Sequence, residues 1–355
     1  MNYIGSKYSL LDFLETSIKQ VVSADCKVFC DLFAGTGAVG THFKSRGFQI
    51  IANDLQYYSY VLNRHYIGNC KPLQFNGLRD LIPKENETLF ESKAAAVCGY
   101  LSNLKGVEGF IFNNYAPTGS LRNGTQRLFF TDENAMKCDA VRMQIETWKQ
   151  KGDITEDEYF FLLTTLLESI DARANTASVY GAFLKNFKRT ALEPLRLKPA
   201  ILAESDSEQA IFNSDVNELI ERIQCDILYL DPPYNHRQYS SNYHILETLA
   251  RYDNPAIHGK TGLRDEDLRS AYCSRNTARQ AFRDLILKAN AKYIFASYNN
   301  EGIMTLDDIR EILEQRGDYR CFTKRYKRFQ ADAESNRNIK GDETIEYLHY
   351  VKVRN

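Results

Sequence analysis

A glycine-rich turn between two short apolar runs is the feature that most constrains the fold. Residues 27–33 have the apolar character of a buried strand, and residues 48–54 repeat it. The turn between them contains Gly35, Gly37 and Gly40, and a helical pattern follows to about Arg46. A strand, a glycine turn, a helix and a second strand form the opening half of a βαβ unit. The sequence therefore predicts an α/β fold with a Rossmann-like, doubly wound sheet.

The rest of the chain divides into a helical middle and a second α/β part. From about residue 57 to about residue 205 the pattern is helical with polar, glycine-bearing loops, and Thr155 followed by three acids predicts a helix start. A segment of this length is too long for a loop. We therefore expect residues 57–205 to form an inserted, mainly helical subdomain, and residues 1–56 and 206–355 to form the α/β domain.

The second α/β part is expected to complete the sheet. Apolar runs predict strands over 225–231 and 293–298, and alternating residues predict a terminal β-hairpin with strands over 319–329 and 344–353. Helical spacing predicts helices over 8–22 and near 239–252, 278–289 and 305–316. The residues after 252 are expected to form a polar loop.

The composition fits a globular protein. The chain has 355 residues, 43% of them hydrophobic, with 45 basic and 46 acidic residues, which excludes a disordered or collagen-like chain. The eight cysteines are dispersed without a CxxC pair and the six histidines are scattered, so we expect reduced thiols and no metal. Neither a leader nor an apolar run of about 20 residues is present, which favours a cytoplasmic protein.

The tetrapeptide Asp231-Pro232-Pro233-Tyr234 is the strongest chemical signal. It follows an apolar strand, at the edge where open α/β sheets bind ligands. Two prolines can serve simply to end a strand, but this interpretation explains neither the acid before them nor the aromatic residue after them. A carboxylate and a rigidly held carbonyl can accept hydrogen bonds from one amino group while a tyrosine stacks on its ring. We expect Asp231, Pro232 and Tyr234 to be the catalytic residues.

The glycine turn carries the pattern G-x-G-x-x-G, and Asp54 ends the next strand. Glycines let the backbone approach a ligand closely, and an acid at this position binds ribose hydroxyls. The pattern fits a dinucleotide, as in a nicotinamide-dependent oxidoreductase, or the adenosine of another cofactor. A tight turn without a ligand is the structural alternative.

In this order the two motifs resemble the alpha group of S-adenosylmethionine-dependent DNA adenine methyltransferases, which includes Dam-like and FokI-type modification enzymes. The segment Tyr3-Ile4-Gly5-Ser6-Lys7-Tyr8 is similar to that group's first motif. Residues 57–205 lie where the group carries its target-recognition insert, and residues 110–115 look closer to the FokI-type enzymes than to Dam. The resemblance implies a methyltransferase sheet with an inserted helical DNA-recognition subdomain.

The resemblance also implies roles for individual residues. It places Asp31 and the glycine turn against the methionine part of S-adenosylmethionine, Asp54 on the ribose and Asp215 on the adenine amine of the cofactor. The implied cofactor-binding residues are Tyr3, Lys7, Asp31, Phe33, Gly35, Gly37, Asp54 and Asp215. The implied reaction is methylation of the exocyclic amine of a flipped-out adenine, with hydrogen bonds from that amine to Asp231 and to the Pro232 carbonyl.

Two basic clusters are candidates for DNA binding. From Arg316 to Lys340 eight basic residues face three acidic ones, and the cluster's candidates are Lys324, Arg325, Tyr326, Lys327, Arg328 and Phe329. Strands with interleaved basic and aromatic residues contact phosphates and unstacked bases. The second cluster, at the end of the insert, has the candidates Lys185, Lys188 and Arg189. A solvated edge strand and a solvated helix face are the respective structural alternatives.

The leading hypothesis is a site-specific DNA adenine methyltransferase that uses S-adenosylmethionine and modifies double-stranded DNA, as the modification half of a restriction-modification system. A cognate endonuclease encoded alongside is the expected partner, and no membrane is expected. The alternatives are a methyltransferase acting on an RNA or on a protein amide nitrogen, a nicotinamide-dependent oxidoreductase, and a non-catalytic DNA-binding module. The oxidoreductase leaves the Asp-Pro-Pro-Tyr motif unused.

Overall fold

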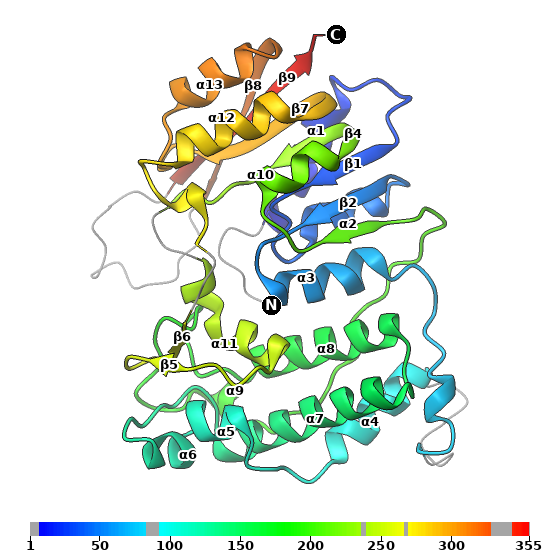
Figure 1. Cartoon of the computed structure of the whole chain (residues 1–355), viewed down its shortest axis with the longest axis vertical. Coiled ribbons are helices and arrows are strands. Elements are labelled where there is room, and N and C mark those ends of the chain that lie inside the picture. Colours follow the sequence, from blue (N-terminus) through cyan, green and yellow to red (C-terminus); the bar gives the residue numbers. More distant parts are fainter. Residues whose placement is uncertain (1–6, 83–91, 236–238, 266–268, 328–342, 355) are drawn as a thin grey trace. The chain divides into compact units, whose positions relative to one another are not determined.

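The structure is a computed structural model and describes residues 7–82, 92–235, 239–265, 269–327 and 343–354. The chain divides into two compact units (Figure 1). An α/β unit comprises Ile4–Asn63, Ser205–Tyr239 and Asp267–Asn355. A helical unit is built mainly from Arg64–Glu204 and Ser240–Glu266. No helix in the described ranges is long and apolar enough to cross a membrane.

The α/β unit is organised around a seven-stranded sheet with the order β3-β2-β1-β4-β7-β9-β8. The strands are β1 (Val28–Asp31), β2 (Gln49–Asn53), β3 (Ala210–Phe212), β4 (Gln224–Leu230), β7 (Asn290–Asn299), β8 (Gly317–Lys327) and β9 (Glu343–Val353). Pairing is parallel from β3 to β7, and β9 runs antiparallel to both of its neighbours. The predicted doubly wound sheet and its terminal hairpin are confirmed.

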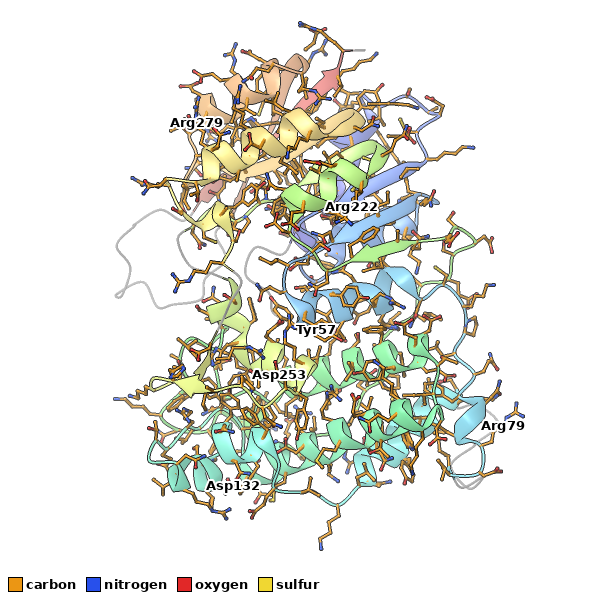
Figure 2. The ribbon with its side chains drawn as sticks, in the orientation of Figure 1. Tyr57, Arg79, Asp132, Arg222, Asp253 and Arg279 are labelled. Atoms are coloured by element: carbon orange, nitrogen blue, oxygen red, sulfur yellow. The ribbon has the colours of Figure 1, made fainter. Side chains whose placement is uncertain are left out.

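Helices cover both faces of this sheet. On one face, α10 (Val216–Leu219), α12 (Ala278–Lys288) and α13 (Leu306–Glu314) bury a continuous apolar core (Figure 1). Arg279, labelled in Figure 2, joins α12 to α13 through ion pairs with Asp308 and Glu311. On the other face, Phe43 of α2 (Ala38–Lys44) stacks on Phe29 of β1 with ring centroids 4.1 Å apart. Residues of alternating side along each strand supply the two cores.

The first helix is shorter than its pattern predicts. The expected helix over 8–22 is a 3₁₀ turn, Tyr8–Leu10, followed by α1 (Leu11–Lys19). Glu15 of α1 pairs with His42 and Arg46 at the end of α2, so the two helices are linked by charge. The strand β3 is an addition to the predicted elements, because a run of only three apolar residues, none of them buried, is too short to stand out in the sequence.

The helical unit packs around α8 (Glu156–Asp171), whose residues are buried nearly all round. Its other helices are α4 (Lys93–Asn103), α5 (Phe110–Tyr115), α6 (Pro117–Arg122), α7 (Asp132–Lys151), α9 (Arg189–Leu192) and α11 (Tyr239–Arg251). The short helix α3 (Tyr57–Asn63) belongs to the α/β unit and continues into a π-helical turn, Arg64–Gly68. Asp132 and Asp253 of the helical unit are labelled in Figure 2.

The boundaries of this unit differ from the expected insert of residues 57–205. The unit begins at Arg64 and takes in Ser240–Glu266, which the sequence pattern assigns to the α/β domain. Buried hydrogen bonds explain the difference. Asp139 of α7 accepts from the Tyr252 hydroxyl at 2.6 Å, and Arg142 donates to the Leu249 carbonyl at 3.1 Å.

A two-stranded hairpin replaces part of the polar loop expected after residue 252. Its strands are β5 (Ile257–His258) and β6 (Leu263–Arg264). The connecting turn is fixed by buried side chains of the helical unit. Arg127 donates to the Gly259 and Lys260 carbonyls, and Tyr115 donates to the Gly262 carbonyl at 2.9 Å. Strands of two residues are too short to give an alternating pattern, so the sequence does not reveal them.

The predicted helix start at Thr155 is confirmed and generates a stability prediction. The Thr155 hydroxyl accepts from the Glu158 amide, and the Glu158 carboxylate accepts from the Thr155 amide, which is a complete capping box. We expect Thr155→Ala to lower the free energy of unfolding by about 1 kcal/mol, measured by denaturant unfolding. Thr147→Ala, inside α7, is the control and should leave stability within about 0.5 kcal/mol of wild type. Equal effects of the two substitutions would contradict the prediction.

Candidate active site at the carboxyl edge of the sheet

The order in which successive strands are added to the sheet reverses between the parallel strands β1 and β4. From β1 the chain proceeds to β2 and β3 on one side, whereas β4 is followed by β7 on the other. In open α/β sheets the carboxyl ends of the two strands at such a point border the ligand-binding crevice. Asp31 is the last residue of β1, and Asp231 directly follows β4. The sheet therefore brings two predicted site residues to one edge.

The glycine turn after β1 adopts a backbone that favours glycine. Gly35 has a φ of 53° and Gly37 a φ of 80°, and Gly37 is the N-cap of α2. Asp54, just beyond β2, accepts a hydrogen bond from the Gly35 amide at 2.8 Å and another from the Gln56 amide at 2.8 Å. The structure thus brings Asp54 and the glycine turn together, and the carboxylate fixes the shape of the turn.

Asp31 is a buried acid with unused hydrogen-bonding capacity. It is 1% exposed, and within the described part of the chain its Oδ1 has no hydrogen-bond partner. Burial raises the pKa of Asp31 well above its ordinary value, and the nearby Asp231 and Asp54 carboxylates raise it further. A buried acceptor without a partner is costly unless a ligand supplies the donor. Asp31 therefore marks a place for a donor or a cation at the end of β1.

The Asp-Pro-Pro-Tyr segment leaves β4 at the same edge. The Asp231 side chain is 16% exposed, and its Oδ1 lies 3.0 Å from the Lys7 Nζ. Burial raises the pKa of Asp231 to about 6, with Lys7 lowering it and Glu346 raising it. Tyr234 is partly buried against the apolar core, and its carbonyl accepts from the Ile303 amide at 3.0 Å. The segment is thus held rigidly with its carboxylate near the surface.

Lys7 has two carboxylate partners. Its Nζ lies 3.0 Å from Asp231 Oδ1 and 3.0 Å from Glu346 Oε1, and its side chain is 7% exposed. Burial alone lowers the pKa of Lys7, but the two carboxylates outweigh it and raise the pKa well above the ordinary value. Glu346 is not among the residues predicted from sequence motifs. The sequence feature that could have revealed it is strand alternation: Glu346 falls on the same side of β9 as the inward-facing Leu348 and Tyr350.

Three further expected cofactor residues fall in different surroundings. Phe33 lies edge-to-face on Tyr272, with ring centroids 5.0 Å apart. Asp215 is exposed and caps α10, accepting from the Asn217 amide at 2.8 Å. Tyr3 lies outside the described residues.

The protein matches a known enzyme family over most of its length. Residues 3–312 match the D12 class N6 adenine-specific DNA methyltransferases. The chain belongs to this family. It is 49% identical to the type II methyltransferase M.NlaIII of Neisseria lactamica, with 99% of each chain covered. The expected resemblance to DNA adenine methyltransferases is confirmed, and an oxidoreductase is not favoured.

Two other relatives show how the chain compares in length. The methyltransferase is 37% identical to the type II methyltransferase M.FokI of Planomicrobium okeanokoites, covering 99% of this chain and 52% of that protein. It is 32% identical to M.CviAII of Paramecium bursaria Chlorella virus 1, covering 99% of this chain and 98% of that protein. The chain therefore spans about half the length of M.FokI and nearly the full length of M.NlaIII and M.CviAII.

The methyltransferase family implies S-adenosylmethionine as the methyl donor, and the edge of the sheet fits such a group. The glycine turn leaves its backbone accessible, and the unpartnered Asp31 Oδ1 suits a positively charged donor. Asp54 presents a carboxylate beside the turn, as ribose hydroxyls require. Within the described ranges, no group of three or more His, Cys, Asp or Glu residues is arranged to hold a metal ion.

The basic residues expected to bind DNA differ in how far they are engaged by the protein. Lys185 and Arg189 are exposed, whereas the Lys188 ammonium donates to the Thr176 carbonyl at 2.8 Å. On β8, Arg325 is exposed and the Lys324 ammonium lies 5.8 Å from the centroid of the Phe13 ring. Tyr326 and Lys327 continue β8, but their side chains, like Arg328 and Phe329, lie outside the described residues.

The pKa of Asp231 predicts how the reaction depends on pH. A value of about 6 means that the carboxylate form dominates above pH 6 and is lost below it. If the charged form accepts from the target amine, kcat/KM for DNA should fall as the pH drops through about 6, because kcat/KM reports the pKa of the enzyme before DNA binds. Methyl transfer measured from about pH 5 to about pH 8 checks this. A kcat/KM that stays constant across that range would contradict it.

Proposed function

We propose that this methyltransferase modifies the exocyclic amine of adenine at a defined sequence in double-stranded DNA, with Asp231, the Pro232 carbonyl and Tyr234 holding the target base. The observation that carries the proposal is the position of the Asp231 carboxylate. It follows the strand at the switch point, on the same sheet edge as Asp31 and the glycine turn. Donor and acceptor sites are expected at one edge because the methyl group must pass directly between them.

The chain's own residues supply orientation more than acid or base strength. S-adenosylmethionine supplies a methyl group that is already activated by its sulfonium. The adenine amine is a poor nucleophile, because its lone pair is delocalised into the ring. Hydrogen bonds from this amine to Asp231 and to the Pro232 carbonyl localise the lone pair and direct it toward the methyl group. The two prolines keep both acceptors fixed, so little reorganisation is needed.

The target adenine is proposed to leave the duplex before transfer. The amine of a paired base is not open to in-line attack, and enzymes that modify bases in duplex DNA extrude them into a pocket. Tyr234 would stack on the extruded ring. Two observations support this role: partial burial restricts the Tyr234 side chain, and the hydrogen bond from the Ile303 amide to its carbonyl fixes the backbone that carries it.

The cofactor contacts are proposed from the same geometry. Lys7, Asp31, Phe33, the glycine turn with Gly35 and Gly37, Asp54 and Asp215 form the expected set, together with Tyr3. Asp31 is proposed to bind the methionine ammonium and Asp54 the ribose. The exposed Asp215 carboxylate, which already orders the start of α10, is proposed to accept from the adenine amine of the cofactor.

A biological role follows from the relatives. M.NlaIII and M.FokI are named as type II methyltransferases. We propose that this enzyme likewise protects cellular DNA from a cognate restriction endonuclease that is encoded alongside it and need not bind it. The helical unit is proposed as the part that reads the DNA sequence, and the cytoplasm as the place of action. Both proposals rest on the family's DNA substrate.

The catalytic assignment predicts that Asp231→Ala abolishes methylation without abolishing cofactor binding. We expect mapping by single-molecule sequencing to find methylated adenines in one sequence context when the wild-type chain is expressed in a host free of adenine methylation.

Asp231→Ala should lower transfer by about 100-fold or more while calorimetry still shows S-adenosylmethionine binding. The exposed Asp206→Asn should behave as wild type. Normal turnover by Asp231→Ala would overturn the assignment.

The basic clusters predict a salt-dependent affinity for DNA. Basic side chains that neutralise phosphates release counterions, so affinity falls as salt rises. The paired substitutions Lys324→Ala with Arg325→Ala, and Lys185→Ala with Arg189→Ala, should weaken binding and lower the slope of log Kd against log salt by about one unit for each phosphate-binding side chain removed. Lys288→Ala, which removes an exposed lysine paired with Glu221, is the control. Unchanged slopes in both paired variants would show that the clusters are only solvated surface.

A further inference from the structure

Three charged side chains meet beside the Asp-Pro-Pro-Tyr segment, and only one of them is cationic. Lys7 Nζ lies 3.0 Å from a carboxylate oxygen of both Asp231 and Glu346. The Glu346 side chain is 1% exposed, against 16% for Asp231. The group therefore combines an acid that reaches toward solvent with a second acid that does not, and both share one ammonium.

Two separate parts of the α/β unit, strand β7 and the N-terminal segment, hold Glu346 in place. It lies on β9, directly opposite Asn299 of β7. From the same strand β7, the Ser297 hydroxyl donates to Glu346 Oε1 at 2.5 Å, and Lys7 approaches this oxygen from the segment before the first helical turn. The sheet provides the serine, and the N-terminal segment provides the ammonium.

The fold itself does not require an acid at position 346. The next inward-facing residues of β9 are Leu348 and Tyr350, which are buried and apolar. A buried carboxylate is costly unless it is paired, and replacing a buried ion pair with apolar residues is often neutral or stabilising. An acid at this position is therefore better explained by what it does to Lys7 and Asp231.

A single ammonium facing Asp231 alone would occupy the acceptor that the target amine needs. An ion pair made only with Lys7 would hold the Asp231 lone pairs and weaken the carboxylate as an acceptor. Removing Lys7 would leave two acids close together and favour the protonated form of one of them. Sharing the ammonium between two acids avoids both outcomes.

We propose that Glu346 is a positioning residue for methyl transfer, which holds the Lys7 ammonium beside Asp231 and offsets its charge so that the Asp231 carboxylate stays available to the target amine. This inference rests on the proposed catalytic role of Asp231. Ser297 belongs to the same arrangement, because its hydroxyl fixes the Glu346 oxygen that contacts Lys7.

Among the described residues, several other charged or titratable groups lie around this cluster. Burial raises the pKa of Tyr229 well above its ordinary value, and burial lowers the pKa of His349 to about 4, so both are neutral at working pH. Tyr234 faces Lys7, and Lys324 lies opposite Glu346 in the β8–β9 register. Asp31 interacts with Asp231 from β1. Glu346 also raises the pKa of His349, so loss of its charge lowers that pKa further and leaves His349 neutral.

The experiment measures kcat and kcat/KM for DNA against pH for Glu346→Gln, using plasmid DNA from a host free of adenine methylation and saturating S-adenosylmethionine. Loss of the neighbouring negative charge lowers the pKa of Asp231, so the acid limb of kcat/KM should move below the wild-type value of about 6. The plateau kcat should fall about tenfold, with little change in the KM for either substrate. Glu346→Asp, which keeps the charge, should retain the wild-type limb.

Controls separate this arrangement from a merely structural role. Asp318→Asn, at an exposed ion pair on the same β8–β9 hairpin, should keep the wild-type profile. If Glu346→Gln does not fold, Ser297→Ala is the deciding variant. Without the serine hydroxyl, Glu346 is expected to pair more closely with Lys7 and draw it away from Asp231. This change should lower kcat and move the acid limb to higher pH.

The outcome at position 346 is distinguishable from failure of the catalytic assignment. A wild-type kcat and acid limb in Glu346→Gln, or in Ser297→Ala where that variant is the one tested, overturns the inference. If Asp231→Ala, measured in parallel, is inactive, the catalytic assignment stands even then. An active Asp231→Ala would instead remove the assignment on which the inference rests.

Discussion

The parallel pairing of β1 with β4 is the interaction on which the site depends. Phe29, Cys30 and Asp31 pair in register with Ile227, Leu228 and Tyr229, so the two strands end at the same edge of the sheet. Both strands lie in the middle of the sheet and are buried on both faces. The hydrogen-bonded backbone of the two strands therefore fixes the positions of Asp31 and Asp231 at their ends. Sites built on such rigid elements are more precise than sites built on loops.

Burying several acids at this edge of the sheet lowers the stability of the α/β unit, and other interactions must offset that loss. Asp31, Asp231 and Glu346 place three acids near one another, and Lys7 is the cation that Asp231 and Glu346 share. Buried charges of this kind stabilise a fold little or not at all. The apolar cores on the two faces of the sheet supply the stability instead, through α12 and α13 on one face and the stacked Phe29 and Phe43 on the other.

Much of this arrangement could be predicted from the sequence, and the exceptions have physical reasons. The glycine turn and the Asp-Pro-Pro-Tyr segment are local signals, in which chemistry and backbone shape occupy neighbouring residues. The strand β3 and the β5–β6 hairpin are too short to show a period, and only tertiary hydrogen bonds join Ser240–Glu266 to the helical unit. In the sequence, Glu346 is marked only by being an acid at a position of β9 whose side chain faces inward. Its partner Lys7 is more than 300 residues away in the sequence, so no local pattern links the two.

The large sequence distance between Lys7 and Glu346 affects when the charge cluster can form during synthesis. Lys7 and Glu346 stand near opposite ends of the sequence, and β9, which carries Glu346, inserts between β7 and β8 after both of these strands have been made. During synthesis, the growing chain contains the glycine turn and the Asp-Pro-Pro-Tyr segment long before the charge cluster can close. Strand β8 must be synthesised, and then the part of β9 that contains Glu346, before the Lys7 ammonium gains its second carboxylate.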